Sequence, residues 1–317
     1  MKLVFFDIEC ASVHKTYSKI CAFGYVVCDE NFNILVKEDI LINPRGRFEL
    51  TDRKGEKGIT LPYEYSEFKK HPSFPSVYKK IKSLLEDKDA CVLGHAVLND
   101  VKYLNLETKR YKLPSLHFKF SDSQLIYMTF VNDFSRQFGL ESIAENLGVE
   151  FTPHRAADDA YATMRIVEAM CKAKNCGYFE LIKLLSITDG EIENYNITRP
   201  QSQAFKKYNA EKRKAKEARS KARVKFNNHF LKKRFKKDGK LGGATFTFSR
   251  IIEDDLSLSM PLVDKIYENG GKYSQQLEFC KYYVEAENDG SARTVMARNT
   301  QGIIIIGLDG LGELLND

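Results

Sequence analysis

Three features common in other proteins are missing from this sequence: tryptophan, a long apolar run and cysteines at Cys-x-x-Cys spacing. No uncharged apolar run approaches the roughly 20 residues of a membrane span, so we expect no membrane contact. The first apolar run, Lys2–Phe6, is ended by Asp7 before it reaches the length of a signal-peptide core. The seven cysteines lack Cys-x-x-Cys spacing, which argues against a zinc site and for reduced thiols. We therefore expect a cytoplasmic protein.

The charge of the chain is unevenly distributed. With 317 residues, of which 43% are hydrophobic and 29% charged, the sequence is typical of a soluble protein that can form two domains. Between Arg199 and Lys240 there are 17 Lys and Arg but only three acids, a net charge of +14. The whole chain carries +6, so the remainder carries −8. The positive charge is therefore confined to one segment.

Two acids end the first apolar run. Asp7 and Glu9 lie two residues apart within Lys2–Glu9, which reads as a buried strand. Because side chains alternate along a strand, both acids point to the same face. Two carboxylates at the end of a buried strand are costly unless a cation or a partner neutralises them. Oxygen ligands of this kind suit Mg²⁺ or Mn²⁺.

Two further acids stand at places where a helix is predicted to begin. Asp100 follows the apolar run Ala90–Gly94 and opens a stretch that can be helical. Asp159 lies in the first turn of a helix predicted over 159–171, where apolar residues recur at helical spacing. His154 precedes Asp159 by five residues, in the loop that enters this turn.

Each of these residues also has an ordinary structural interpretation. Asp100 could cap its helix, and Asp158 could be the first-turn acid in place of Asp159. His95 and His154 taken singly could be structural histidines, and for His95 we keep that interpretation. The complete set at the predicted junctions favours a metal-dependent nuclease site. Two metal ions roughly 4 Å apart can drive phosphodiester hydrolysis, and a histidine can take the proton from the attacking water.

These motifs resemble those of the DEDDh-type exonucleases, to which the proofreading subunit of bacterial DNA polymerase III belongs. Asp7-x-Glu9 is similar to the first motif, Gly94 through Asp100 to the second, and His154-x-Ala-x-x-Asp159 to the third. The sister subgroup has a tyrosine four residues before the last aspartate, where this chain has Arg155. The resemblance covers roughly residues 1–185 and implies an RNase H-like α/β domain with a mixed sheet. It also implies two Mg²⁺ (or Mn²⁺) ions held by Asp7, Glu9, Asp100 and Asp159, with His154 as the base.

The substrate-binding residues are less well matched to this family. The segment Lys57–Thr60 is similar to the family's His-Gly-Ile-Thr, with Lys57 in place of the histidine. Cys10 stands where a threonine often follows the first glutamate, and Ala96 and Asn99 replace an asparagine and a phenylalanine. None of these changes removes a metal ligand. By resemblance, the expected substrate-binding residues are Cys10, Gly58, Ile59 and Thr60.

The basic segment 199–240 is predicted to be a helical linker. It has no Gly or Pro from Gln201 to Asp238, and its alanines favour helix. Phe226, Phe230, Leu231 and Phe235 recur at helical spacing, which suggests that its second half packs on another part of the chain. The segment is either a basic arm that binds nucleic acid or a solvated spacer, and the nuclease motifs favour the arm.

The remaining residues, 241–317, alternate strands with helices, which predicts a small parallel sheet. Strands are expected at 245–249, 281–285 and 302–307, and helices at 258–267, near 293–301 and at 311–315. With Gly270–Gly271 after its first helix, this segment resembles a BRCT domain, a phosphate-recognising and protein-docking module. The resemblance implies a protein or DNA-end partner, and Ser249 and Arg293 are the nearest matches to its phosphate-binding pair. Arg250 replaces the usual glycine and the tryptophan of the last helix is missing, so phosphopeptide specificity is unsupported.

The combined prediction is a metal-dependent 3′–5′ exonuclease of DNA that releases nucleoside 5′-monophosphates in repair or proofreading. One alternative is an RNA exonuclease, because the same metal site serves both sugars. A second is a non-catalytic tether that recruits repair factors through the basic segment and the C-terminal domain. The intact set of catalytic positions argues against the tether.

Overall fold

The computed structural model describes residues 1–48, 61, 63–150, 155–234, 236 and 238–316. The chain divides into two compact units, Met1–Asn209 and Ala210–Asp317. The division falls within helix α8 (Gln203–Phe230). The predicted boundaries at 185, 199, 240 and 241 stay a prediction.

The first unit is built on a seven-stranded mixed sheet with strand order β3-β2-β1-β4-β5-β7-β8. Its strands are β1 (Lys2–Val13), β2 (Ser18–Cys28), β3 (Ile34–Leu41), β4 (Ala90–Gly94), β5 (Phe118–Asp122), β7 (Gly190–Glu193) and β8 (Asn196–Thr198). The strands β1, β2 and β3 form an antiparallel meander, β4 and β5 continue in parallel with β1, and β7 and β8 are antiparallel. The predicted mixed sheet is confirmed. A separate two-stranded pair is formed by β6 (Ile187–Thr188) and β9 (Gln201–Ser202).

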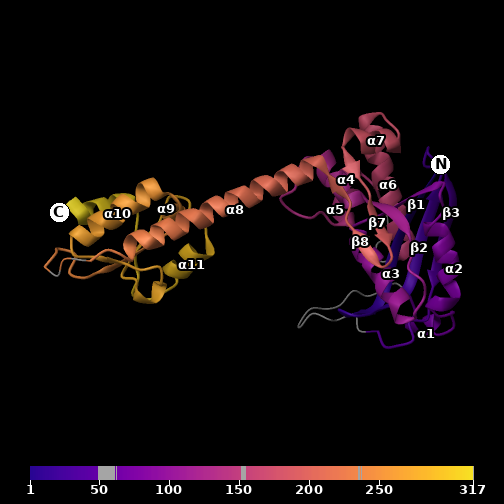
Figure 1. Cartoon of the computed structure of the whole chain (residues 1–317), viewed down its shortest axis with the longest axis horizontal. Helices are drawn as coiled ribbons and strands as arrows, with labels where there is room; N and C mark the ends of the chain where they lie inside the picture. The colour runs from indigo at the N-terminus through magenta and orange to yellow at the C-terminus, as the bar shows by residue number, and fades with distance from the viewer. Residues whose placement is uncertain (49–60, 62, 151–154, 235, 237, 317) are drawn as a thin grey trace. The chain divides into compact units, whose positions relative to one another are not determined.

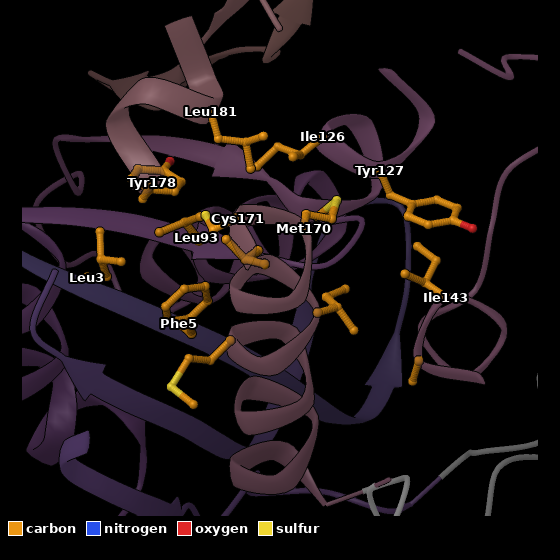
Figure 2. Packing of buried hydrophobic residues seen from close by; sticks show 14 of the residues in the cluster. Leu3, Phe5, Leu93, Ile126, Tyr127, Ile143, Met170, Cys171, Tyr178 and Leu181 are labelled. Atoms are coloured by element: carbon orange, nitrogen blue, oxygen red, sulfur yellow. The ribbon is translucent and has the colours of Figure 1, made fainter. Parts of the chain in front are cut away.

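Helices cover both faces of this sheet (Figure 1). They are α1 (Tyr65–Phe68), α2 (Phe74–Leu85), α3 (Leu98–Arg110), α4 (Ser123–Phe130), α5 (Leu140–Leu147), α6 (Ala156–Lys174) and α7 (Tyr178–Leu184). Strand β1 shows the two faces clearly. Leu3 and Phe5 belong to the core that contains α6, whereas Val4 and Phe6 belong to the core that contains α2 and α3. Figure 2 shows the first of these cores, with Phe5 beside α6.

The second unit holds a four-stranded sheet of order β11-β10-β12-β13, and all of its pairs are parallel. The strands are β10 (Thr245–Phe248), β11 (Lys272–Tyr273), β12 (Tyr282–Val284) and β13 (Ile304–Ile306). The helices are α9 (Arg250–Asp254), α10 (Leu256–Glu268), α11 (Ala292–Arg298) and α12 (Leu308–Asn316), with a 3₁₀ turn at Leu277–Phe279. The predicted small parallel sheet is therefore present. The short elements α9 and β11 were not expected from the sequence.

Helix α8 contributes to the hydrophobic cores of both units. Ala204, Phe205 and Tyr208 pack against the core of the first unit. Phe226 and Phe230 are buried in the core of the second unit. The expected packing of the second half is thus observed for these two residues, whereas Leu231 is 72% exposed, because α8 ends at Phe230 and the apolar stripe ends with it. Phe235 lies outside the described residues.

Candidate active site

Strand β1 carries two acids on the face of the sheet that α6 covers. Asp7 and Glu9 continue the alternation of Leu3 and Phe5, so all four side chains are directed to that face. Carboxylate oxygens of Asp7, Glu9 and Asp159 all lie within 4.8 Å of one another. The structure thus brings the first and last predicted metal ligands together, and these three acids are the centre of the site.

Helix α6 reaches this centre because Gly24 leaves room for its backbone. Gly24 is paired with Asp7 on one side and with Asp39 on the other, in a row across β1, β2 and β3. A Cβ atom on Gly24 would lie 2.0 Å from the backbone of Ala156 and Ala157. The first turn of α6 therefore rests directly on the sheet, and this turn carries Asp159.

Asp158 and Asp159 have different neighbours. Asp158 forms an ion pair with Lys37 of β3 at 2.6 Å. Asp159, one residue later, is the acid within reach of Asp7 and Glu9. Asp159 as a metal ligand stays a prediction.

Asp100 lies at the junction of β4 and α3, in the first turn of the helix as expected. The turn between them is tight: Ala96 has a φ of 48°, and a Cβ on Gly94 would meet the side chain of Val97 at 2.6 Å. Asp100 is only 7% exposed, and the charges of Asp7 and Glu9 act on its pKa. It is thus the fourth acid around the site, although it is outside the tight group of three.

The site is strongly acidic and partly withdrawn from water. Burial, followed by repulsion from Asp159 and Asp39, raises the pKa of Asp7 to about 8. Burial and the charge of Asp7 raise the pKa of Glu9 to about 9. The pKa of Asp100 is raised well above its usual range, mainly by burial. Among the described residues, none forms an ion pair with Asp7 or Glu9.

These donors fit divalent metal ions. Clustered carboxylates repel one another unless protons or a cation neutralise them. Hard oxygen ligands are those that Mg²⁺ and Mn²⁺ prefer. The acidic centre is therefore a candidate metal site formed by Asp7, Glu9 and Asp159, with Asp100 beside it.

Comparison with known families supports this interpretation. The model of the family described as Exonuclease matches residues 4–167, which is more than half of the chain. The chain belongs to this exonuclease family. The prediction that it is an enzyme with exonuclease activity is thereby confirmed.

Three solved structures are similar to this exonuclease over part of the chain. One, described as a 3′-exonuclease that recognises the 3′ end of a histone mRNA stem-loop, has a TM-score of 0.49 and 15% identity, over 64% of this chain and 91% of that one. Escherichia coli exonuclease I with a dT13 oligonucleotide has a TM-score of 0.43 and 16% identity, over 58% of this chain and 43% of that one. The nuclease domain of 3′hExo, a DEDDh family member bound to rAMP, has a TM-score of 0.43 and 18% identity, over 54% of this chain and 91% of that one. No curated protein matches the chain.

His95 has a structural role in the exonuclease, as expected. Its Nδ1 lies 3.0 Å from Ser123 Oγ, and its Nε2 lies 3.2 Å from the carbonyl oxygen of Phe138. Burial lowers the pKa of His95 to about 4, so the ring is neutral near neutral pH. It therefore links the β4–α3 turn to the start of α4 and the segment before α5.

Two further acids near the site were not identified from the sequence. Asp122 accepts hydrogen bonds from the amides of Ala96 (3.0 Å) and Gln124 (2.9 Å), so it caps α4 and holds the turn before Asp100. Burial raises the pKa of Asp122 to about 6. Its position directly after Phe118–Ser121, in which apolar and polar residues alternate as in a strand, is a signal that could have revealed it. No local sequence pattern identifies Asp39, because it reaches the site only through the pairing of β3 with β2.

Several predicted site residues lie outside the described part of the chain. These are His154 and the substrate-binding residues Gly58, Ile59 and Thr60. Cys10 is described: it is half-buried, packs against the core with α2 and α3, and follows an irregularity in the pairing of β1 with β2. Burial raises the pKa of its thiol well above the usual range, so the thiol is protonated at neutral pH.

Ser249 and Arg293 both have partners within the second unit. Ser249 is fully buried, and its hydroxyl accepts a hydrogen bond from the amide of Ala286 at 3.3 Å. Arg293 donates to Glu253 Oε1 at 2.8 Å and to the carbonyl oxygen of Gln275 at 2.6 Å. These contacts give both residues a structural role, and phosphate binding by them stays a prediction. Among the described residues, no helix is both long and apolar enough to cross a membrane.

Proposed function

We propose that this exonuclease is metal-dependent, degrades DNA from the 3′ end and releases nucleoside 5′-monophosphates. The observation that carries the proposal is the group of Asp7, Glu9 and Asp159, whose carboxylate oxygens lie within 4.8 Å of one another. The proposed cofactors are two Mg²⁺ (or Mn²⁺) ions held by these acids and Asp100. When bound, such ions activate a water molecule and stabilise the leaving oxygen.

The protein supplies the ligands and the base. The four acids come from β1, α3 and α6, so their relative positions are set by secondary structure. His154 is proposed to take the proton from the attacking water. Its place in the sequence, directly before Arg155 at the start of α6, supports this role. Cys10 and residues 58–60 are proposed to bind the terminal nucleotide.

The basic helix supports nucleic acid as the partner. Residues 211–221 of α8 are all exposed, and they include six Lys and Arg against two Glu. Phosphates of a nucleic acid are the polyanion that such a surface attracts. Outside residues 199–240 the chain carries −8, so we assign the capture of the substrate to this helix.

The second unit supports DNA over RNA by its resemblance to BRCT domains of repair proteins. Its parallel sheet and the Gly270–Gly271 turn fit that resemblance. We propose that it docks a protein or a DNA end, and that the enzyme acts in repair or proofreading. A phosphate at Ser249 and Arg293 would have to compete with Glu253 for the arginine.

An RNA exonuclease is the second candidate. The acid cluster would act on the phosphate. Nothing in the motifs of its described members recognises the 2′ hydroxyl that distinguishes ribose from deoxyribose. The same metal chemistry therefore serves both substrates.

Matched oligonucleotides test this proposal. The full-length protein is incubated with single-stranded DNA and RNA of one sequence, labelled at the 5′ end, with Mg²⁺ or Mn²⁺. We expect faster stepwise shortening of DNA and nucleoside 5′-monophosphates as products, and binding without cleavage in Ca²⁺. Faster degradation of RNA would establish the second candidate instead.

Two variants connect that activity to the acid cluster. Asp7→Ala and Asp159→Ala each remove a ligand, so we expect kcat to fall on the order of a thousandfold or more. Asp158→Ala, which removes the half-buried partner of Lys37, is the control and should retain activity. Substantial turnover by both ligand variants would contradict the assignment.

A further inference from the structure

Asp39 connects three separate segments of the chain through one carboxylate oxygen. Its Oδ2 accepts a hydrogen bond from the Tyr63 hydroxyl at 2.5 Å and from Arg155 Nε at 3.2 Å. The guanidinium of Arg155 also lies over the Tyr63 ring, 5.9 Å from its centre. The Asp39 side chain is only 10% exposed, whereas that of Arg155 is 54% exposed. A largely buried acid thus holds an arginine at the surface.

The strand register defines where Asp39 lies relative to the active site. Asp7, Gly24 and Asp39 form one row across three strands, and the backbone of Ala156 and Ala157 rests on the middle position. Directly opposed residues of antiparallel strands point to the same face. Asp7 and Asp39 therefore lie on either side of the first turn of α6.

Arg155 is the residue that begins this helix. Its extended backbone (φ −119°, ψ 116°) caps α6, yet the cap makes no side-chain hydrogen bond within the helix. The Arg155 side chain instead reaches Asp39. Asp159 follows Arg155 by four residues, which is about one helical turn. The position of Arg155 thus determines where the turn with Asp159 lies.

The second oxygen of Asp39 has an uncommon environment. Oδ1 is buried, and among the described residues it has no hydrogen-bond partner. A buried acceptor without a donor is costly, so such a group calls for a functional or structural explanation. Its location beside the helix that carries a metal ligand favours a functional one.

We propose that Asp39 is a positioning residue of the active site. Through Arg155 and Tyr63 it fixes the first turn of α6, and thereby holds Asp159 against Asp7 and Glu9. The proposal rests on the proposed metal-dependent function for its effect on catalysis. The structural part, the restraint on α6, does not depend on it.

The same helix turn offers a matched control. Lys37, two residues before Asp39 on β3, pairs with Asp158 at 2.6 Å, but the acid of this pair is more exposed than Asp39, at 26% against 10%. Exposed ion pairs of this kind contribute little. Removing the Lys37 pair should therefore leave the turn in place, and removing the Asp39 contacts should not.

The experiment compares Asp39→Asn, Asp39→Glu and Arg155→Gln with Lys37→Ala in the full-length protein. The first readout is hydrogen exchange of the amides of 156–160 in the metal-free protein, which needs no activity. In Asp39→Asn and Arg155→Gln we expect exchange to become at least about tenfold faster in this turn and unchanged in α2 and α3. Lys37→Ala should remain within about twofold of the wild type.

The second readout is kinetic. For Asp39→Asn we expect kcat to fall about 10- to 100-fold, with KM for the nucleic acid within about twofold and a higher Mn²⁺ concentration at half-maximal rate. Asp39→Glu should recover part of kcat. The proposal would be overturned if Asp39→Asn had the same hydrogen exchange and the same kcat as Lys37→Ala. It would also be overturned if exchange became faster throughout the first unit. If the wild type cleaves no nucleic acid, the proposed function fails, while the exchange at 156–160 still decides the role of Asp39.

Discussion

At the scale of single residues, the active-site acids oppose folding when no metal is bound. Asp7 and Glu9 have raised pKa values because burial and repulsion from neighbouring acids, Asp159 among them, disfavour the charged forms. Both conditions follow from placing carboxylates next to one another on a packed sheet. Catalytic capacity is therefore obtained at the expense of stability in the metal-free protein.

This conflict gives a pH dependence whose sign follows from the pKa shifts. The pKa values of Asp7 (about 8) and Glu9 (about 9) lie above the ordinary value near 4, so the folded state binds more protons than the unfolded state between these limits. Stability in EDTA should fall as pH rises from about 5 to about 8. Asp7→Asn should reduce this fall, as measured by thermal unfolding at each pH.

Two comparisons complete that measurement. Asp158→Asn, outside the acid cluster, should retain the pH dependence of the wild type. Added Mg²⁺ should raise the melting temperature more at the higher pH, because ligation requires the deprotonated acids. A melting temperature of the metal-free wild type that is constant over this range would contradict the pKa shifts.

At the scale of elements, the sequence indicated the parts of the site that depend on local pattern. The alternation in β1 placed Asp7 and Glu9 on one face, and helical spacing placed Asp100 and Asp159 in first turns. These features depend on neighbours within a few residues, so they can be predicted without knowing the fold. The same holds for the strands and helices of the second unit other than the short elements α9 and β11.

What the sequence could not indicate depends on strand register. The roles of Gly24 and Asp39 arise because β2 and β3 pair with β1 so that both residues share a row with Asp7. That register is fixed by packing of the whole sheet rather than by local pattern. Asp122 is an intermediate case, because its capping of α4 is local but its bond to Ala96 is not.

The contact between Gly24 and α6 can be tested by adding one methyl group. In Gly24→Ala the new Cβ would clash with the backbone of Ala156 and Ala157, so α6 must shift. Overpacking of this kind costs about 1–3 kcal/mol or more, and the shift should also move Asp159 and lower kcat. Gly139→Ala is the control, because nothing lies within 4 Å of its Cβ position. Urea unfolding and kcat measure the two effects, and equal behaviour of both variants would be inconsistent with close packing at Gly24.

At the scale of the whole molecule, the positive charge is concentrated on one helix. Residues 211–221 of α8 have no buried position, so their charges are available to solvent and to a polyanion. The acid cluster itself repels phosphates unless metal ions are bound. Binding and cleavage are thus assigned to different parts of the chain, and they should respond differently to salt and to mutation.

Neutralising part of α8 tests this division. We expect the triple substitution Lys214→Gln, Lys216→Gln and Lys221→Gln to weaken the binding of single-stranded DNA in Ca²⁺. The slope of log K against log salt should become shallower by up to about 0.7 for each phosphate that the helix no longer neutralises. Fluorescence anisotropy at several salt concentrations measures both quantities.

The matched control neutralises three exposed lysines of the first unit, Lys79, Lys88 and Lys183. It changes the net charge equally and should leave the slope close to that of the wild type. Equal loss of affinity in both triple variants would show that net charge, and not the helix, attracts the nucleic acid.

The exposure of 211–221 has one more consequence, for the susceptibility of the chain to proteases. Trypsin cleaves after Lys and Arg, and this stretch offers such sites without a packed face to protect them. On one side of the stretch, Phe205 and Tyr208 are held by the core of the first unit, and on the other, Phe226 and Phe230 are held by that of the second. A single cut there would separate the nuclease from its C-terminal companion while each fragment kept its own hydrophobic interior.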